Sequence, residues 1–251
     1  MQAYGKDFAS IYNIKWQAFI KQVAPYILDF YNSTETGQGN KPVLDLCCGT
    51  GQLAVYFLER GYRVTGIDLS NHMLHYAREN AGKYIESGQA CFMNADAGDF
   101  SVAERFGLVV STYDALNHLE SKQTLANCFK CVYDVCEGYF IFDLNTKRGL
   151  KNWNGIHVNE HDDDTLIITR GIYDEQSDKA WTKFTGFTLN PDGSYNRFDE
   201  TVYNTAFDMD WVRETLLTVG WKDVRFAKIQ NLDKPLNDPE SEPRVFVVVS
   251  K

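Results

Sequence analysis

Acidic side chains and a glycine-rich bend accompany the apolar runs in the first half of the sequence. Asp45 stands near the end of one run and precedes the bend Gly49-Thr50-Gly51, while Asp68 and Asp96 close or follow the next two runs. Glycine lets a backbone bend tightly and approach a ligand closely, and a carboxylate accepts hydrogen bonds from hydroxyl and amino groups. The pattern therefore indicates a nucleoside site, in which Asp68 would accept hydrogen bonds from both ribose hydroxyls.

An alternation of apolar runs and amphipathic segments positions these residues. Each run suits a buried parallel strand, and each amphipathic segment suits a helix that covers the sheet. The strands are expected at 42–46, 63–67, 90–93, 108–111, 139–142, 221–229 and 244–250, and the helices at 16–31, 53–58, 73–76, 121–136 and 208–218. The last two strands would close the sheet as an antiparallel hairpin. The expected fold class is α/β, a Rossmann-like seven-stranded, mostly parallel sheet with helices on both faces.

Residues 151–207 break this alternation. Strands are expected at 166–170, 179–188 and 195–203, with Asn190-Pro191-Asp192-Gly193 as a hairpin turn. This is a small antiparallel insertion after the fifth strand, and residues 1–150 and 208–251 would form the main domain. We expect the insertion to act as a substrate lid. Its aromatic walls and cations would come from Trp181, Phe184, Phe187, Tyr195, Phe198, Arg170, Tyr173 and Arg197.

The segment Val43-Leu44-Asp45-Leu46-Cys47-Cys48-Gly49-Thr50-Gly51 resembles the first motif of class I S-adenosylmethionine-dependent methyltransferases, acidic-x-Gly-x-Gly-x-Gly. Cys47 stands where the family most often has its first glycine. Residues 49–54 also fit the G-x-G-x-x-A pattern of dinucleotide-binding folds. Asn94-Ala95-Asp96-Ala97 and the terminal strand pair resemble methyltransferase features that dinucleotide enzymes do not require. The resemblance therefore favours S-adenosyl-L-methionine as the cofactor.

The resemblance also implies which residues hold this cofactor. Leu69 would flank the adenine, Asp96 would bind the adenine amino group, and an N-terminal tyrosine, Tyr4 or Tyr12, would lie over the cofactor. The expected cofactor-binding set is Tyr4, Tyr12, Asp45, Cys47, Gly49, Thr50, Gly51, Asp68, Leu69, Met73, Asp96, Ala97, Thr112 and Tyr113.

Methyl transfer is an in-line displacement, so the enzyme mainly has to position the acceptor. A protonated amine must also lose a proton, which a histidine or carboxylate in the segment Ser111–His118 can accept. The segment lacks the Asn/Asp-Pro-Pro-Tyr signature of nucleobase-amine and glutamine methylation and a Pro-Cys nucleophile. Residues 4–12 and the insertion are similar to those of small-molecule N-methyltransferases such as aminosugar dimethyltransferases. This resemblance implies that His118 is the catalytic base and that Tyr12 is a second catalytic candidate.

Several alternatives stay open. His118 would otherwise cap a helix or sit in the core, and Tyr12 would only pack the N-terminal helix. An O-methyltransferase, or a non-catalytic regulatory protein that binds S-adenosylmethionine, would have a similar sequence pattern.

The formal net charge of −9 leaves no basic field that would attract a phosphate backbone or an anionic lipid. Residues 1–7 lack a charged-then-apolar signal pattern, and no apolar run is long enough to span a bilayer. We therefore expect a cytoplasmic monomer or homodimer. Its partner would be a small-molecule acceptor, not a nucleic acid or a membrane.

Two patterns typical of metal sites are interpreted as structural. Cys128 and Cys131 share the expected helix 121–136, and no second pair or following histidine completes a zinc site, so reduced thiols are expected. His157-Val-Asn-Glu160-His161 matches the inverted zinc-protease pattern but runs into an acidic stretch, which predicts a solvated loop. His72 and His75 are expected on a helix surface. No metal is expected.

Overall fold

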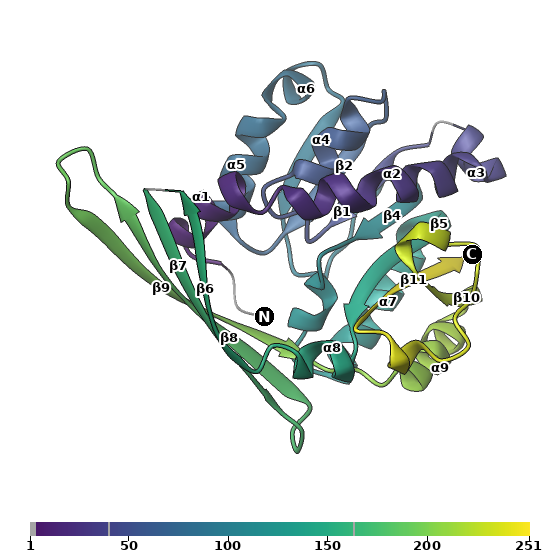
Figure 1. The fold of residues 1–251 in the computed structure, drawn as a ribbon. Coiled ribbons are helices and arrows are strands. Elements are labelled where there is room, and N and C mark those ends of the chain that lie inside the picture. The colour runs from purple at the N-terminus through teal and green to yellow at the C-terminus, as the bar shows by residue number, and fades with distance from the viewer. Residues whose placement is uncertain (1–3, 40, 163) are drawn as a thin grey trace.

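The strands form two separate sheets (Figure 1). The computed structural model describes residues 4–39, 41–162 and 164–251, with the side chains of 159–162 outside the described part. Residues 1–3, part of the stretch 1–7 that lacks a signal pattern, therefore lie outside the described residues. Within the described ranges, the main sheet has seven strands in the order β10-β11-β5-β4-β1-β2-β3, and the insertion sheet has four in the order β6-β7-β8-β9.

The strand bounds follow the expected alternation closely. The main sheet consists of β1 (Val43–Leu46), β2 (Val64–Asp68), β3 (Ala90–Asn94), β4 (Phe106–Ser111), β5 (Cys136–Asn145), β10 (Lys222–Ala227) and β11 (Arg244–Ser250). The insertion sheet consists of β6 (Gly155–Asp162), β7 (Thr165–Asp174), β8 (Lys179–Leu189) and β9 (Tyr195–Thr205). β1 pairs in parallel with β2 and β4, whereas β11 runs antiparallel to both β5 and β10. The predicted fold class, including the terminal hairpin, is confirmed.

Helices cover both faces of the main sheet. The helices are α1 (Lys6–Lys15), α2 (Ala18–Asn32), α3 (Glu35–Gln38), α4 (Gln52–Leu58), α5 (Asn71–Asn80), α6 (Gly82–Glu86), α7 (Lys122–Val135), α8 (Lys147–Lys151), α9 (Met209–Val219) and the 3-10 turns η1 (Ala115–His118), η2 (Ile229–Asn231) and η3 (Pro239–Ser241). One apolar cluster joins α7 and α9 to one face, and another joins α2, α4 and α5 to the other. Successive strand residues such as Val43 and Leu44 enter opposite clusters because side chains alternate across a sheet.

Capping residues fix where several helices begin and end. Ser70 caps α5 by accepting from the Met73 amide, and Asp208 caps α9 by accepting from the Trp211 amide. Gly220, at φ 115°, ends α9 in the left-handed conformation that glycine adopts without steric cost. His72 and His75 lie exposed on α5, as predicted.

The insertion sheet faces the carboxyl ends of the parallel strands, with α1 between it and α5 (Figure 1). Phe8 of α1 packs in one cluster with Met73 of α5, Ile167 of β7 and Phe198 of β9. Its ring centroid lies 5.1 Å from that of Phe184 in β8. Helix α1 therefore packs between α5 and the insertion sheet through a largely aromatic contact surface.

The loop predicted for the inverted zinc-protease pattern was wrong. Residues Gly155–Asp162 form β6, which pairs antiparallel with β7 along its length. Because β6 is an edge strand, backbone pairing holds it without much apolar burial: Ile156 and Val158 are 66% and 65% exposed. The inverted zinc-protease motif needs a helix that presents both of its histidines on one face, and a strand does not provide this arrangement. The side chains of Glu160 and His161 lie outside the described part.

All six cysteines belong to the described residues and are free thiols. Cys48, Cys128 and Cys136 are buried, whereas Cys91 is exposed. Among the described residues, no group of three His, Cys, Asp or Glu side chains lies close enough to hold a metal ion. In that same part of the chain, no helix combines the length and apolarity needed to cross a membrane.

Candidate active site

A crevice opens where β1 and β2 end. The turn from β1 to α4 passes through three left-handed residues, Cys47 (φ 60°), Gly49 (φ 54°) and Gly51 (φ 76°). At Gly51 a Cβ atom would lie 3.0 Å from the Ala77 Cβ, so glycine also allows α4 and α5 to approach. Cys47 adopts the same backbone conformation with a side chain, which costs about 1–2 kcal/mol in non-glycine residues.

Asp68 is tied to this turn by backbone hydrogen bonds. Its Oδ2 accepts from the Gly49 amide at 2.8 Å, and its Oδ1 accepts from the Ser70 amide at 2.8 Å. Burial raises the pKa of Asp68, while these amide bonds act in the opposite direction. Each carboxylate oxygen keeps a second lone pair, so Asp68 can still accept hydrogen bonds from a ligand.

Asp45, in β1, lines a small hollow beside this crevice. Only 2% of the residue is exposed, and its Oδ2 has no hydrogen-bond partner among the described residues. Burial raises the pKa of this carboxyl group to about 8 from its ordinary value of 3.8, and nearby Asp68 adds to the increase. A buried acid with a free acceptor atom is costly unless a ligand donor completes it.

Most of the residues predicted to bind the cofactor surround the crevice. The crevice is lined by Tyr4, Tyr12, Cys47, Gly49, Asp68, Leu69, Met73, Ala97, Thr112 and Tyr113, together with His118, Ile67, Ala95 and Ala115. Asp45 and Thr50 line a small adjoining hollow. Gly51 and Asp96 line neither space, and Asp96 accepts a hydrogen bond from the Gly98 amide at 2.7 Å.

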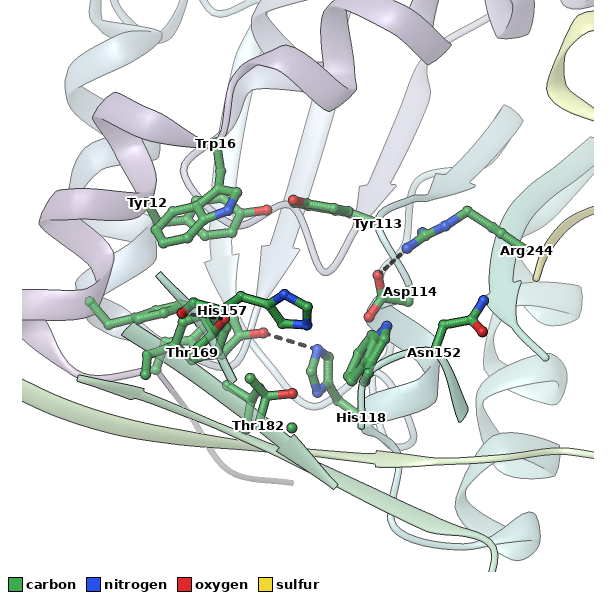
Figure 2. Close-up of a pocket in the computed structure, with 16 residues that line it drawn as sticks. Tyr12, Trp16, Tyr113, Asp114, His118, Asn152, His157, Thr169, Thr182 and Arg244 are labelled. Carbon is green, nitrogen blue, oxygen red and sulfur yellow. Dashed lines mark hydrogen bonds and ion pairs between the residues drawn. The ribbon is translucent and has the colours of Figure 1, made fainter. Parts of the chain in front are cut away.

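A second space, the acceptor cavity, has a volume of about 360 Å³ and lies between the main sheet and the insertion sheet (Figure 2). An aromatic row on and before α1 forms one wall, and β6 to β9 form the facing wall. The lining residues are Tyr4, Phe8, Tyr12, Trp16, Tyr113, Asp114, His118, Asn152, Trp153, His157, Thr169, Gly171, Thr182, Phe184, Val202 and Arg244. Its volume is typical of pockets that hold small molecules.

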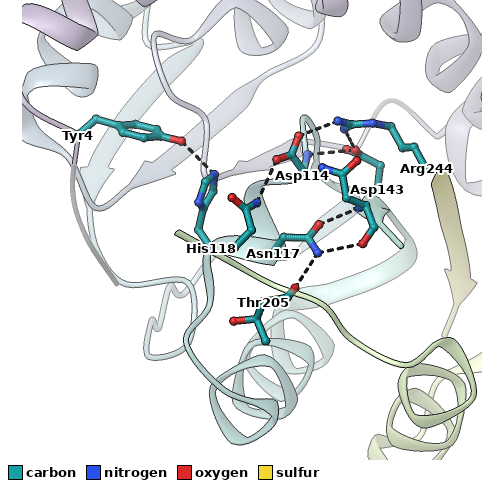
Figure 3. A network of polar contacts seen from close by, with 9 residues as sticks. Tyr4, Asp114, Asn117, His118, Asp143, Thr205 and Arg244 are labelled. Carbon is teal, nitrogen blue, oxygen red and sulfur yellow. Dashed lines mark hydrogen bonds and ion pairs between the residues drawn. The ribbon is translucent and has the colours of Figure 1, made fainter. Parts of the chain in front are cut away.

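Four side chains line both spaces: Tyr4, Tyr12, Tyr113 and His118. Of these, Tyr4 and His118 are joined by a hydrogen bond of 2.9 Å between the phenol oxygen and Nε2 (Figure 3). The other imidazole nitrogen, Nδ1, lies 2.7 Å from the Tyr203 carbonyl oxygen. A carbonyl only accepts, so Nδ1 carries the proton, and in the neutral ring Nε2 accepts from the Tyr4 hydroxyl.

Burial keeps the tyrosines of this boundary protonated. It raises the pKa of Tyr4 and of Tyr12 well above the ordinary value, and Asp114 and Asp68 add to the increase in both cases. The pKa of Tyr113 is raised to about 12, again mainly by burial.

An ion-pair network supports the corner after β4. Arg244 of β11 donates to Asp114 at 2.7 Å and also hydrogen-bonds to the fully buried Asp143 (Figure 3). Tyr113 and Asp114 are both left-handed, at φ 69° and 50°. The Tyr113 ring stacks on Phe19 at 4.4 Å, which helps to hold this strained corner.

Below this corner, η1 is fixed by Asn117. Its side-chain amide donates to the carbonyl oxygens of Asn145 at 3.1 Å and Thr205 at 2.9 Å, and its Oδ1 accepts from the Asn145 amide at 2.9 Å. The turn that carries His118 is therefore held by the ends of β5 and β9.

Sequence reasoning missed several residues of the cavity. Tyr4, Phe8, Tyr12 and Trp16 follow one another at intervals of four residues. This spacing places side chains on one face of a helix, so the sequence alone could have indicated that Phe8 and Trp16 lie beside the two tyrosines. Asp114 belongs to the segment singled out after the fourth strand but was not assigned a role. No local signal marks Asn152, Trp153, His157 and Arg244, which only the tertiary structure brings together.

The predicted wall of insertion aromatics was partly wrong. Strand register places Phe184, Phe198 and Tyr173 on the face toward the main sheet. The opposite face carries Trp181, Phe187, Tyr195, Arg170 and Arg197. Strict alternation splits the set, because a two-faced sheet can place only every second residue toward the cavity.

Comparison with known proteins agrees with this architecture. Residues 43–137 match the family described as "Methyltransferase domain". YqeM of Bacillus subtilis (strain 168), a protein that carries a methyltransferase name, is 30% identical over 184 residues, which cover 72% of this chain and 73% of YqeM. This chain belongs to the S-adenosylmethionine-dependent methyltransferases.

Two solved structures share the fold over nearly the whole chain. An S-adenosylmethionine-dependent methyltransferase from Clostridium acetobutylicum ATCC 824 is similar with a TM-score of 0.78 and 22% identity, covering 97% of each chain. The sugar N-methyltransferase KedS8 from Streptoalloteichus sp ATCC 53650 is similar with a TM-score of 0.76 and 17% identity, covering 100% of this chain and 94% of KedS8.

The residues of the crevice and of the adjoining hollow fit S-adenosylmethionine. The free acceptor oxygen of Asp45 suits the ammonium group of the amino-acid part, and the spare lone pairs of Asp68 suit ribose hydroxyls. Gly49 lines the crevice, and a Cβ added there would lie 3.8 Å from Cε1 of the Tyr12 ring, in ordinary van der Waals contact.

Proposed function

We propose that this methyltransferase acts on an amine nitrogen of a small molecule held in the acceptor cavity. The observation that carries the proposal is the Tyr4–His118 hydrogen bond, which lies where the crevice and the cavity meet. The likeness to the sugar N-methyltransferase KedS8 supports a small amine acceptor. A hydroxyl acceptor is the alternative, because it would lose its proton to the same pair.

The cofactor supplies an activated methyl group on a sulfonium sulfur. The acceptor nitrogen uses its lone pair to form the new N–C bond as the S–C bond breaks, and the sulfur keeps that electron pair. An amine that arrives protonated has to release one proton before this step. We assign Tyr4, Tyr12, Tyr113 and His118 to holding the acceptor at the boundary, where orientation contributes most of the rate.

The proton path follows from the tautomer of His118. Nδ1 already carries a hydrogen toward the Tyr203 carbonyl, so Nε2 is the basic atom, and the Tyr4 hydroxyl occupies it. The Tyr4 oxygen would take the proton of the acceptor while giving its own proton to Nε2. Because burial raises the pKa of Tyr4, the phenol passes the proton on and does not persist as phenolate. Tyr4 is thus the relay and His118 the final base.

Two substitutions test this assignment. Tyr4→Phe and His118→Gln should each lower kcat on an accepted amine by about 10²-fold or more, the lower range for general-base catalysis. The affinity for S-adenosylhomocysteine, measured by calorimetry, should change little in either variant. His75→Gln, on the exposed surface of α5, is the matched control and should keep full activity. Unchanged turnover in both Tyr4→Phe and His118→Gln would remove the pair from the mechanism.

A further inference from the structure

Two carboxyl groups share a single guanidinium at one corner of the acceptor cavity. Arg244, Asp114 and Asp143 form one bonded group of a single cation and two carboxylates. Asp143 is fully buried beneath Arg244, whereas Asp114 and Arg244 line the cavity. The group therefore presents a carboxylate to the cavity and a guanidinium that is already neutralised.

The cations around the cavity have partners of their own. Among the described residues, Lys147 pairs with Asp178 at 2.9 Å and Lys151 pairs with Glu175 at 3.0 Å. The Lys179 ammonium donates to the Thr205 hydroxyl at 2.7 Å. None of these three lysines lines the cavity.

Other carboxylates add to the negative field. Glu200 of β9 accepts from the Gly5 amide at 3.3 Å, next to Tyr4. The pKa of Tyr4 is raised first by burial and then by the charges of Asp114, Asp68 and Glu200. The phenol at the boundary of the two spaces therefore lies in a negative potential, which suits a cationic ligand.

Asp114 has spare acceptor capacity toward the cavity. Its Oδ1 accepts from Arg244 at 2.7 Å and its Oδ2 accepts from Asn204 at 3.2 Å, so each oxygen keeps a lone pair. Figure 2 shows Asp114 between Arg244 and His118, with its contact to Arg244 drawn as a dashed line. Aromatic rings within reach favour cations through cation–π attraction and favour alkyl groups through burial.

We propose that the acceptor is a cationic amine that carries no phosphate or carboxylate group, and that Asp114 binds its ammonium group before the proton is lost. This inference rests on the proposed function and adds the charge class of the acceptor. An anionic substituent would face the Asp114 carboxylate with no unpaired cation on the described cavity wall, so its desolvation would go uncompensated.

Asp114 serves the acceptor and not the cofactor. Although S-adenosylmethionine is also cationic, Asp114 lines the acceptor cavity and not the crevice, whereas Asp68 lines the crevice and not the cavity. Removing the charge of Asp114 should therefore weaken amine binding and leave cofactor binding intact.

Matched probe pairs test the charge class directly. Tyramine and tyrosine differ by a carboxylate, and glucosamine and glucosamine 6-phosphate differ by a phosphate. The binding of each probe is measured by calorimetry on the 251-residue protein saturated with S-adenosylhomocysteine. Tyramine should bind at least about tenfold more tightly than tyrosine, and glucosamine at least about tenfold more tightly than glucosamine 6-phosphate. Equal or tighter binding of the anionic members, or no binding of any of the four probes, would overturn the inference without any variant being made.

The variant Asp114→Asn tests the assigned residue. It should weaken the binding of tyramine and glucosamine by about tenfold and bring the affinity ratio within each pair close to one, since it removes the carboxylate that attracts the ammonium group and repels an anionic substituent. Asp199→Asn removes a carboxylate from the opposite face of the insertion sheet and should preserve both affinities and ratios. An unchanged ratio in Asp114→Asn, with S-adenosylhomocysteine affinity and melting temperature retained, would refute the role of Asp114.

The outcomes separate the two proposals. Amines that bind through Asp114 but are never methylated would refute the proposed function and leave the inference standing. Methylation of an amine that carries a phosphate or carboxylate, with a kcat/KM at least equal to that of its matched partner, would refute the inference and leave the proposed function standing.

Discussion

Arg244, on the last strand of the main sheet, holds Asp114 of the corner after β4 through an Nη2–Oδ1 contact of 2.7 Å. The same guanidinium compensates Asp143, which is fully buried. One residue near the end of the chain therefore fixes both the sheet core and the wall of the acceptor cavity.

Arg244→Gln should destabilise the protein by about 3–5 kcal/mol, because removing one partner leaves a buried charge uncompensated. Urea unfolding measures this free energy. The double variant Arg244→Gln/Asp143→Asn should recover part of the loss, since the uncompensated charge is then absent. A loss below about 1 kcal/mol in the single variant would contradict the structural role of this contact.

Asp45 should make stability depend on pH. Burial raises its pKa to about 8, so the folded state binds this proton more tightly than the unfolded chain does. The stabilisation is present in full below the unfolded pKa of about 4 and is lost as the pH rises toward about 8. The side chain introduced by Asp45→Asn cannot ionise, so this variant should not lose stability as the pH rises toward about 8.

Thermal unfolding of the cofactor-free protein measures the difference. Asp45→Asn should melt a few degrees above the wild type at about pH 8, because each ~1 kcal/mol moves the midpoint of a domain of this size by ~2–4 °C. The gap should close as the pH falls below about 4, where the wild-type carboxyl is protonated in both the folded and the unfolded state. A gap that does not vary with pH would show that the Asp45 proton plays no part.

Cys47 and the adjacent Cys48 should respond oppositely to replacement by glycine. Cys47 is left-handed at φ 60°, so Cys47→Gly relieves ~1–2 kcal/mol of backbone strain against ~0.4–1 kcal/mol of added unfolded-state entropy. It should be at least as stable as the wild type. Cys48 is buried among apolar residues, and Cys48→Gly should lose more than about 1 kcal/mol. Denaturant unfolding that ranks the two variants in the reverse order would contradict the backbone argument.

Two phenylalanines of β8 form a matched pair on opposite faces of the insertion sheet. Phe184 lines the acceptor cavity and packs on Phe8, whereas Phe187 lies on the other face. Phe184→Ala should raise the KM for an accepted amine by about tenfold, corresponding to ~1.4 kcal/mol of lost contact. Phe187→Ala should leave KM within experimental error, and equal effects of the two would show that the insertion sheet does not contact the acceptor.

Much of the main sheet was predictable because its strands are continuous apolar runs and its helices have clear caps. Ser70, Asp208 and Gly220 act at the expected termini. The strand β6 was missed because an edge strand needs only backbone pairing, and its alternation of polar residues with the exposed Ile156 and Val158 resembles a loop.

The crevice was more predictable than the cavity. Its residues follow consecutive strands, so their convergence follows from parallel pairing alone. The cavity draws Arg244 from the last strand and His157 from an edge strand, and no local pattern links them. Which aromatics of the insertion face inward depends on the direction in which the sheet docks, and Phe8 of α1 helps to set that direction only in the folded structure.

The most direct test of the proposed activity is to incubate the protein with S-adenosylmethionine labelled with ¹³C in its methyl group and a panel of small amines that includes tyramine and glucosamine. We predict that ¹³C NMR detects the label on nitrogen, together with an equal amount of S-adenosylhomocysteine. A label found on oxygen, or the absence of transfer to any amine by protein shown to bind the cofactor, would contradict the account.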